Sequence, residues 1–373
     1  MPSHKSQHYV PQFLLRNFSH DEKYISLWNF ARRKAVHGVR IKSQCAKNYF
    51  YGKDLWVEKW LGSIETHFSQ LARTLIREAQ IPLHNDDAFN VRSFALLQHM
   101  RTAAAAAESD SITAGMISVV RNQSTKEVRD RLENPPPGHP TAQQACLEAA
   151  ITSLPLVQDL GVKILTNDHD EGFILSDNPV VLQNQWAERA KVFSHILGKT
   201  GLAVRGLLIY MPLSPTTMIC LYDSDVYRVG GRNSSVRASK KDVRNLNKLQ
   251  AVNAQQNLYF EKGSLGENVL KELARIREGH PDVHVAEIYE GPVVNVHDGD
   301  TKNMVSAGTP DVRIDARISS VTIVENVPKG PYRYVVLPPR SVERIRISEQ
   351  AREVWHNGYQ SLSPYDFHRA YKS

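Results

Sequence analysis

The chain has 373 residues, of which 41% are hydrophobic, 23% charged and 8% aromatic. These are ordinary values for a globular protein, and they exclude a wholly disordered or collagen-like chain. At roughly 150 residues per domain, the length predicts two domains or one large one. The formal net charge of +7 permits a polyanionic partner, but no block of five or more basic residues occurs, which favours an ordinary mildly basic protein.

The cysteines and the hydropathy pattern predict a compartment. Cys45, Cys146 and Cys220 are far apart and form no C-x-x-C motif, which argues against a disulfide framework or a cysteine-rich zinc module. Residues 1–16 lack the apolar stretch of a secretory signal, and no run approaches the roughly 18 apolar residues of a membrane span. We therefore expect a cytoplasmic protein without a membrane partner.

The first third of the chain is predicted to be mainly helical, with a small β element near its start. Alternating apolar residues predict a strand over 24–30, which pairs with 36–41. A short helix is expected over 12–18, and an apolar stripe predicts a long helix over 55–80. Further helices are predicted over 87–108, 111–132 and 141–152, with a proline-rich loop at 134–140.

The pattern changes to mixed elements after residue 160. Short strands are predicted at 162–166, 172–175, 202–211 and 217–222, with a hairpin turn at 168–171. Helices are predicted at 239–260, 265–278 and within 342–359, and strands at 293–296, 312–324 and 333–337. The sequence thus predicts an α+β fold in which a helical N-terminal part packs on a mixed or antiparallel sheet, followed by an accessory β-rich C-terminal part.

Polar residues interrupt the apolar stripes of the first long helices. Glu65 lies between Leu61 and Phe68 on one stripe, and Gln98 and Arg101 share a face with Phe94. Buried charge is costly unless it is paired, so one hypothesis is an internal ion pair between Glu65 and Arg101. The other is a polar pocket in which Arg101 binds phosphate or carboxylate.

A second polar group follows a hydrophobic strand, at Ser176-Asp177-Asn178-Pro179. Side chains at strand ends often bind ligands or take part in catalysis. The alternative is an Asx-turn in which Asp177 accepts hydrogen bonds from nearby backbone amides.

The third candidate is His8, which precedes Pro11 and Gln12 in an extended segment. It is a candidate general acid or base, a metal ligand, or a buried histidine with a carboxylate partner. The asparagines of the helix over 243–260 are expected to serve as caps or hydrogen-bond donors between domains.

These motifs together resemble a mostly bacterial family known as domain of unknown function 4238. The resemblance rests on the segment from His8 to Gln12, on Gln98 and Arg101, and on Ser176 to Pro179, and it spans about residues 4–262. It implies that His8, Gln98, Arg101, Ser176, Asp177 and Asn178 belong together, but it implies no reaction. Residue 103 is alanine where the resemblance leads us to expect proline. We divide the chain into a family core, 1–262, with parts 1–133 and 141–262, and an accessory region, 263–373.

Three functional hypotheses follow. The first is a metal-dependent hydrolase or nuclease for a phosphoester or nucleic-acid substrate, with catalytic His8, Glu65 and Asp177 and with Mg²⁺ or Mn²⁺ held by Glu65 and Asp177. Its predicted substrate-binding residues are Gln12, Gln98, Arg101, Ser176 and Asn178. The second is a non-catalytic binding or sensing module for an anionic ligand or a protein partner. Across these hypotheses, the candidate partners are nucleic acid or an anionic small molecule. The third is a buried structural network that joins two subdomains.

Overall fold

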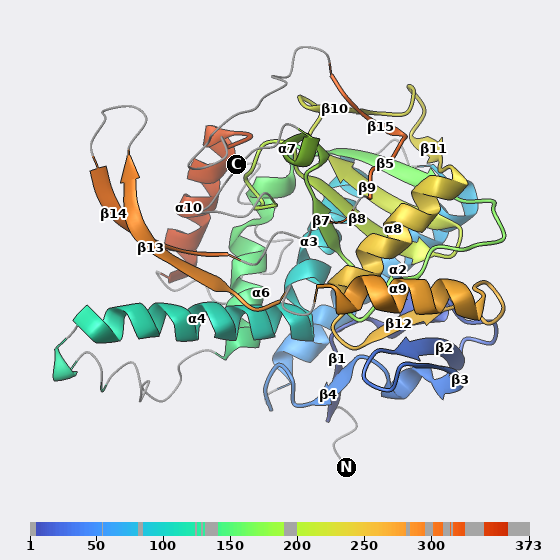
Figure 1. Cartoon of the computed structure of the whole chain (residues 1–373), viewed down its shortest axis with the longest axis horizontal. Helices are drawn as coiled ribbons and strands as arrows, with labels where there is room; N and C mark the ends of the chain where they lie inside the picture. Colours follow the sequence, from blue (N-terminus) through green and yellow to red (C-terminus); the bar gives the residue numbers. More distant parts are fainter. Residues whose placement is uncertain are drawn as a thin grey trace.

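The structure is a computed structural model, and it confirms an α+β fold built on mixed and antiparallel sheets (Figure 1). The residues it describes are 5–53, 55–80, 85–123, 125–127, 130, 141–189, 200–280, 284–294, 301–308, 314, 316–324 and 339–356. Within these residues, every helix is too short or too polar to cross a membrane. The predicted loop at 134–140 and the predicted strand at 333–337 lie outside the described residues.

A five-stranded sheet forms the centre of the molecule, in the order β11-β5-β9-β8-β7. Its strands are β5 (Gly161–Thr166), β7 (Val181–Gln183), β8 (Leu208–Ser214), β9 (Thr217–Tyr222) and β11 (Ser235–Arg237). Only the pairing of β11 with β5 is parallel among these neighbours, so the sheet is mixed. The predicted strands at 162–166 and 217–222 are therefore confirmed.

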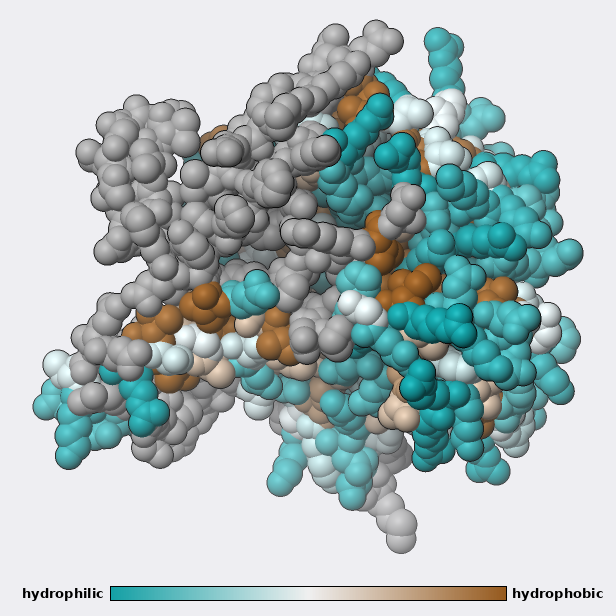
Figure 2. Space-filling view, viewed as in Figure 1, coloured by the Kyte–Doolittle hydropathy of each residue, from teal (hydrophilic) through white to brown (hydrophobic). Residues whose placement is uncertain are grey.

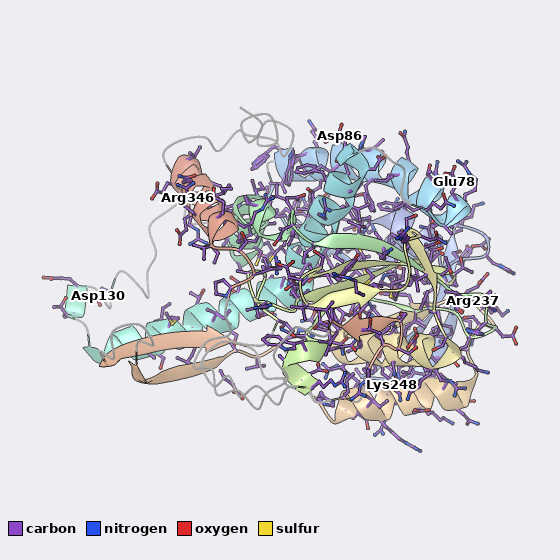
Figure 3. The ribbon with its side chains drawn as sticks, turned by 90° about the horizontal axis from the view of Figure 1, so that it is seen from above. Glu78, Asp86, Asp130, Arg237, Lys248 and Arg346 are labelled. Atoms are coloured by element: carbon purple, nitrogen blue, oxygen red, sulfur yellow. The ribbon has the colours of Figure 1, made fainter. Side chains whose placement is uncertain are left out.

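Both faces of this sheet are buried, because successive side chains of a strand point to opposite faces. Ile209 and Met211 of β8 join the core that includes α2 (Trp56–Glu78) and α3 (Asn85–Met100). Leu208 and Tyr210 pack into a second core with α8 (Lys240–Asn253). The view from above accordingly shows the sheet between the helices that carry Glu78 and Asp86 on one side and Lys248 of α8 on the other (Figure 3).

A second sheet joins the two parts of the family core, 1–133 and 141–262. Its strand order is β3-β2-β12-β6. Its strands are β2 (Tyr24–Asn29), β3 (Lys34–Arg40), β12 (Asn257–Phe260) and β6 (Leu175–Ser176), with α9 (Glu267–Glu278) following β12. The helix predicted over 239–260 is wrong at its end. Ala254 leaves the helical region with ψ 139°, and residues 257–260 instead pair with both β2 and β6.

The helix boundary predicted near residue 110 is also wrong. The break lies at Arg101 and Thr102, and α4 runs unbroken over Ala103–Gln123. The Thr102 hydroxyl accepts a hydrogen bond from the amide of Ala105 and so caps this helix. Residue 103 is the first residue of α4, a position that favours proline. The alanine found there instead is also compatible with the helix, because alanine has the highest helix propensity.

The hairpin predicted at 168–171 does not form. β5 pairs with β9 and β11 instead. Of the predicted strand at 172–175, only Leu175 enters a sheet, together with the following Ser176. The remaining elements of the core are β1 (Ser6–His8), α1 (Gln12–Arg16), η1 (Ile41–Ser43), β4 (Ala46–Asn48), α6 (Ala142–Thr152), η2 (Leu154–Val157), α7 (Gln185–Arg189) and β10 (Tyr227–Val229).

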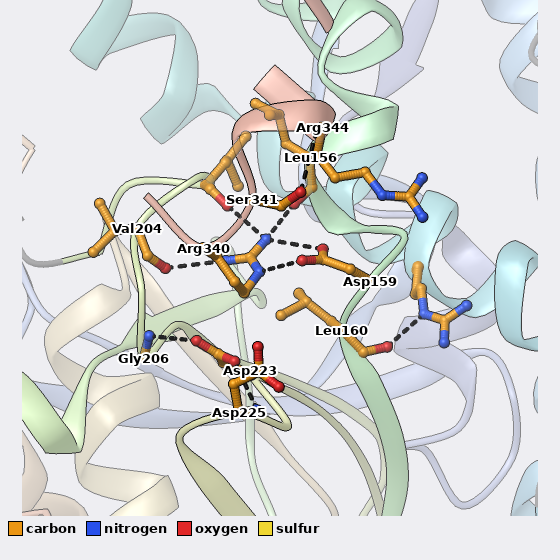
Figure 4. Close-up of polar contacts among 12 residues, drawn as sticks. Leu156, Asp159, Leu160, Val204, Gly206, Asp223, Asp225, Arg340, Ser341 and Arg344 are labelled. Carbon is orange, nitrogen blue, oxygen red and sulfur yellow. Dashed lines mark hydrogen bonds and ion pairs between the residues drawn. The ribbon is translucent and has the colours of Figure 1, made fainter. Parts of the chain in front are cut away.

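The C-terminal region packs on the core at several places. The antiparallel strands β13 (Glu287–Val294) and β14 (Thr301–Gly308) extend along α4 (Figures 1 and 3). β15 (Val321–Ile323) pairs with β10, and α10 (Val342–His356) packs on α6 and η2. The last contact depends on Arg340, whose guanidinium pairs with Asp159 at 2.8 Å and donates to three backbone carbonyls (Figure 4).

Candidate functional site

Arg101 lies at the centre of a buried polar cluster between α2, α3 and the N-terminal segment. Its side chain is 1% exposed and forms an ion pair of 2.7 Å with Glu65 Oε1. The same guanidinium donates to the carbonyl of His8 at 2.6 Å and to the hydroxyl of Tyr51 at 3.2 Å. Burial lowers the pKa of Arg101, but Tyr51 and Glu65 more than compensate, so its pKa is raised. Arg101 is therefore a permanent cation that ties β1 to two helices.

Two carboxylates of α2, Glu58 and Glu65, lie two helical turns apart and border this cluster. Glu65 is one quarter exposed, whereas one carboxylate oxygen of Glu58 is buried and has no partner in the described part of the chain. Burial raises the pKa of Glu58, Arg101 lowers it, and the neighbouring charge of Glu65 raises it further. The Glu65–Arg101 ion pair that the sequence offered as one of two hypotheses is thus present.

His8 lies at the edge of the same cluster. Its Nε2 is 3.2 Å from the carbonyl of Lys42, which fits a ring protonated at Nε2. Burial lowers the pKa of His8, while the Lys42 carbonyl and the Glu65 charge oppose this shift. The ring is consequently neutral at pH 7. Its partner is a backbone carbonyl, and the carboxylate partner considered from the sequence is not in direct contact.

Gln98 and Gln12, both predicted to bind substrate, differ in burial and in hydrogen-bond partners. Gln98 is fully buried and donates to the carbonyl of Tyr9 at 3.0 Å, so α3 holds two consecutive carbonyls of the N-terminal segment. The oxygen of the Gln98 amide has no partner among the residues that the structure describes. Gln12 is half-buried and accepts a hydrogen bond from Arg16 on its own helix. Gln12 therefore makes none of the hydrogen bonds that define the Arg101 cluster.

Asp177 is sealed inside the protein and bound by backbone amides. One oxygen accepts from Gln255 at 2.8 Å, and the other accepts from Gln256 at 2.7 Å and Asn257 at 3.1 Å. Burial raises the pKa of Asp177 to about 6, although the three amides lower it. Asp177 thus accepts from backbone amides, but not in the local Asx-turn that the sequence predicted, because the amides come from the connection between α8 and β12, about 80 residues away in sequence.

Ser176 and Asn178 belong to a ladder of amide side chains along α8. Gln250 accepts from the Ser176 hydroxyl at 2.8 Å, and Asn253 donates to the carbonyl of Asn178 at 2.6 Å. One turn earlier, Asn247 binds both the amide of Ile174 and the carbonyl of Gly172. These side chains provide the hydrogen bonds that a neighbouring strand would otherwise supply to residues 172–180. Asn247 and Asn253 of this helix thus bind backbone groups of residues 172–180, within the same part, 141–262, of the family core, and these contacts do not join two domains.

One hydrogen bond joins the two networks. Thr102, at the end of α3, donates to the side-chain oxygen of Asn178 at 3.0 Å. The sequence motifs around His8, Arg101 and Asp177 therefore meet within one connected region of the protein. Glu65 and Asp177 nevertheless have separate partners, Arg101 for one and three backbone amides for the other. Across the described residues, no group of three or more His, Cys, Asp and Glu side chains is arranged to hold a metal ion.

Sequence reasoning missed three residues of this region. Tyr51 donates to the carbonyl of Arg101 at 3.1 Å, and the Cys45 thiol donates to Tyr259 at 3.3 Å beneath the N-terminal segment. Burial raises the pKa of all three of these side chains. Cys45 precedes β4 and Tyr51 follows it, in short connections without periodicity, so no sequence pattern marks them as part of this region. Tyr259 falls in the segment that the sequence predicts to be helical.

Comparison with known protein families identifies the family of this chain. Residues 6–264 match the model of a family described as a protein of unknown function, DUF4238. No curated protein and no solved structure matches the chain. Because the family match covers more than half of the 373 residues, the chain belongs to the DUF4238 family.

Proposed function

We propose that this DUF4238 protein is a non-catalytic binding module for nucleic acid, and that its N-terminal element makes the contact. The observation that carries this proposal is the distribution of charge. Residues 1–60 contain eleven Lys and Arg against four Asp and Glu, a net charge of +7. The other 313 residues contain 35 of each sign and are neutral. The whole excess positive charge of the protein therefore belongs to one sixth of its chain.

All eleven basic side chains are exposed. The segment that carries them, residues 5–60, is called the basic element below; it forms the lower end of the molecule in Figure 1, where Figure 2 shows largely hydrophilic side chains. An exposed cluster of one sign attracts phosphate groups and releases their counterions. No block of five basic residues is needed, because the fold gathers residues that are separate in sequence.

Aromatic side chains alternate with these cations. Tyr24 is 41% exposed and pairs with Arg40 across β2 and β3. The Lys5 ammonium lies 5.9 Å from the ring of Tyr49, which is half-buried. Exposed rings between basic side chains suit single-stranded nucleic acid, since unpaired bases stack on aromatic faces while the cations bind the backbone. This combination favours a single strand over a duplex.

The buried network supports binding more than hydrolysis. A hydrolase of the predicted kind needs carboxylates that are free to hold a metal ion or activate water. Glu65 is engaged by Arg101, and Asp177 by three amides. The hydrogen bonds from Arg101 to the His8 carbonyl and the Tyr51 hydroxyl fix β1 and the loop after β4 to the end of α3, which holds the basic element in a defined orientation. The metal-dependent hydrolase stays a prediction, tested by incubating the protein with labelled RNA and DNA and with Mg²⁺ or Mn²⁺.

The binding proposal is tested by fluorescence anisotropy with a labelled single strand. Lys42 and Lys47 are exposed residues of the basic element, and Lys240 and Lys241 are exposed residues of α8. We expect Lys42→Gln with Lys47→Gln to weaken binding about tenfold or more and to lower the salt slope by about 1.4. The matched control, Lys240→Gln with Lys241→Gln, should leave both values nearly unchanged. Equal losses in the two double variants, or no binding by the intact protein at low salt, would refute the proposal.

A further inference from the structure

A pocket opens between three helical segments on the side of the sheet that faces α2. Its walls come from α2, α3 and the segment formed by α6 and η2. Aromatic rings form much of it: Trp60 and Phe68 from α2, and Phe89 and Phe94 from α3. Phe68 and Phe94 stack with their ring centroids 3.7 Å apart and their planes within 5°. Two helices thus meet through flat aromatic surfaces that also line an accessible space.

The polar side chains that line this pocket are those of Trp60, His67, Asn90 and Ser93. Asn90 and His67 are joined by a hydrogen bond of 3.2 Å, and Ser93 accepts one from Gln158 at 3.3 Å. No Asp, Glu, Lys or Arg of the described chain lines the pocket. A charged ligand would lose its hydration here without gaining an opposite charge, so the lining selects a neutral ligand. The amide and the hydroxyl provide hydrogen bonds for one polar substituent.

The size of the pocket restricts the ligand further. The cavity volume is about 50 Å³, and the pocket is open to solvent on one side. A cavity of about 150 Å³ encloses a benzene molecule, so this pocket encloses only part of one ring unless its walls move. An inserted helix or strand of a partner protein needs far more space. A single ring that enters by its edge fits, because ring edges pack favourably against aromatic faces.

We propose that this pocket binds a small, neutral molecule with a single aromatic ring and one hydrogen-bonding substituent. The ring lies against Phe68 and Phe89, and the substituent meets Asn90 or Ser93. The proposal goes beyond nucleic-acid binding and does not depend on it. The pocket also adjoins the basic element, since the ring of Phe13 in α1 lies 6.3 Å from Phe68 and 5.9 Å from Phe94 behind the stacked pair.

The test uses phenol as the probe and cyclohexanol as the non-aromatic comparison, with binding followed by saturation-transfer NMR of the full chain. For a fragment of this size we expect a saturable dissociation constant on the order of 1 mM. Ser93→Leu fills the rim and should weaken phenol binding at least tenfold. Ser63→Leu makes the same change at an exposed position of α2 outside the pocket, and it should bind like the parent protein.

Four results would overturn the proposal: no phenol binding by the folded parent protein, unchanged binding by Ser93→Leu, an equal loss in Ser63→Leu, or cyclohexanol binding as tight as that of phenol. A thermal melt shows whether each variant is folded. If Ser93→Leu does not fold, Asn90→Leu replaces it, because Asn90 is half-buried at the same rim and its loss should likewise weaken phenol binding.

Discussion

The buried carboxyl of Asp177 predicts an unusual dependence of stability on pH. Most carboxylates in folded proteins have lowered pKa values and stabilise the fold as pH rises. Burial instead raises the pKa of Asp177 from an ordinary value of 3.8 to about 6, against the opposing effect of three amide donors. Between these two pH values the folded protein holds the proton more tightly than the unfolded chain does. The contribution of Asp177 is therefore fully present below about pH 3.8 and is lost as pH rises to about 6.

The size of this effect follows from the shift. A difference of about two pKa units corresponds to about 3 kcal/mol, since each unit is worth about 1.36 kcal/mol. Asp177→Asn removes the titrating proton while keeping a similar shape. We expect the free energy of unfolding of the parent protein, relative to Asp177→Asn, to fall by up to about 3 kcal/mol between pH 4 and pH 7.

The assay is urea unfolding of both proteins at several pH values in this range. The difference between them isolates Asp177, because all other groups titrate in both. Asp170→Asn changes an exposed aspartate and is the matched control; its difference from the parent protein should stay flat. A parent protein that instead gains stability relative to Asp177→Asn as pH rises would show that the amides outweigh burial.

Two further predictions concern the arginines that tie distant parts of the chain together. Arg101→Ala should lower the free energy of unfolding by about 3–5 kcal/mol in a urea titration, because it leaves Glu65 without its buried partner. The control Arg16→Ala, at an exposed position, should change this free energy by less than about 0.5 kcal/mol. Equal effects of the two substitutions would contradict the argument. Arg340→Ala should release α10, seen as faster hydrogen exchange over residues 342–356, because it removes the bidentate contact with Asp159 (Figure 4). The control Arg346→Ala breaks an exposed pair and should leave that exchange unchanged; protection retained in Arg340→Ala would show that packing alone holds the helix.

Local patterns in the sequence were sufficient to predict elements with strong periodicity or clear caps. Thr141 and Ser239 each form a capping box at the start of a predicted helix. Two errors have a different origin. Residues 257–260 carry no local signal that separates them from α8, and they form a strand because β2 and β6 lie on either side. The break at Thr102 depends on one hydroxyl that caps α4 and also binds Asn178, and helix periodicity does not register either contact.

The candidate site shows the same division between local and tertiary information. The sequence identified Gln98 and Arg101 because they interrupt an apolar stripe, and Asp177 because it follows a hydrophobic strand. It identified His8 as a histidine in the extended segment before Pro11. It did not identify their partners, since most are backbone groups: the carbonyls of His8 and Tyr9, and the amides of residues 255–257. A backbone group has no signature in the sequence. Residue types therefore predicted that these positions matter, while only the fold distinguishes a bound carboxylate from a free one.

This distinction bears on how the motifs of the DUF4238 family are interpreted. A catalytic cluster and a structural cluster both place charged side chains inside a protein, but a structural one leaves few polar atoms unpaired. Here the side chains of Arg101, Asp177 and Asn178 bind backbone or side-chain groups from other parts of the chain. Six buried side-chain atoms of the described residues have no partner, and three of them belong to the helices that meet at Arg101: one oxygen each of Glu58 and Gln98, and Nδ1 of His99. Glu58 interacts electrostatically with Arg101, and Gln98 binds the carbonyl that follows His8. Any chemistry of the buried region would therefore be centred on the His8 side of the network, adjacent to the basic element, and not at Asp177.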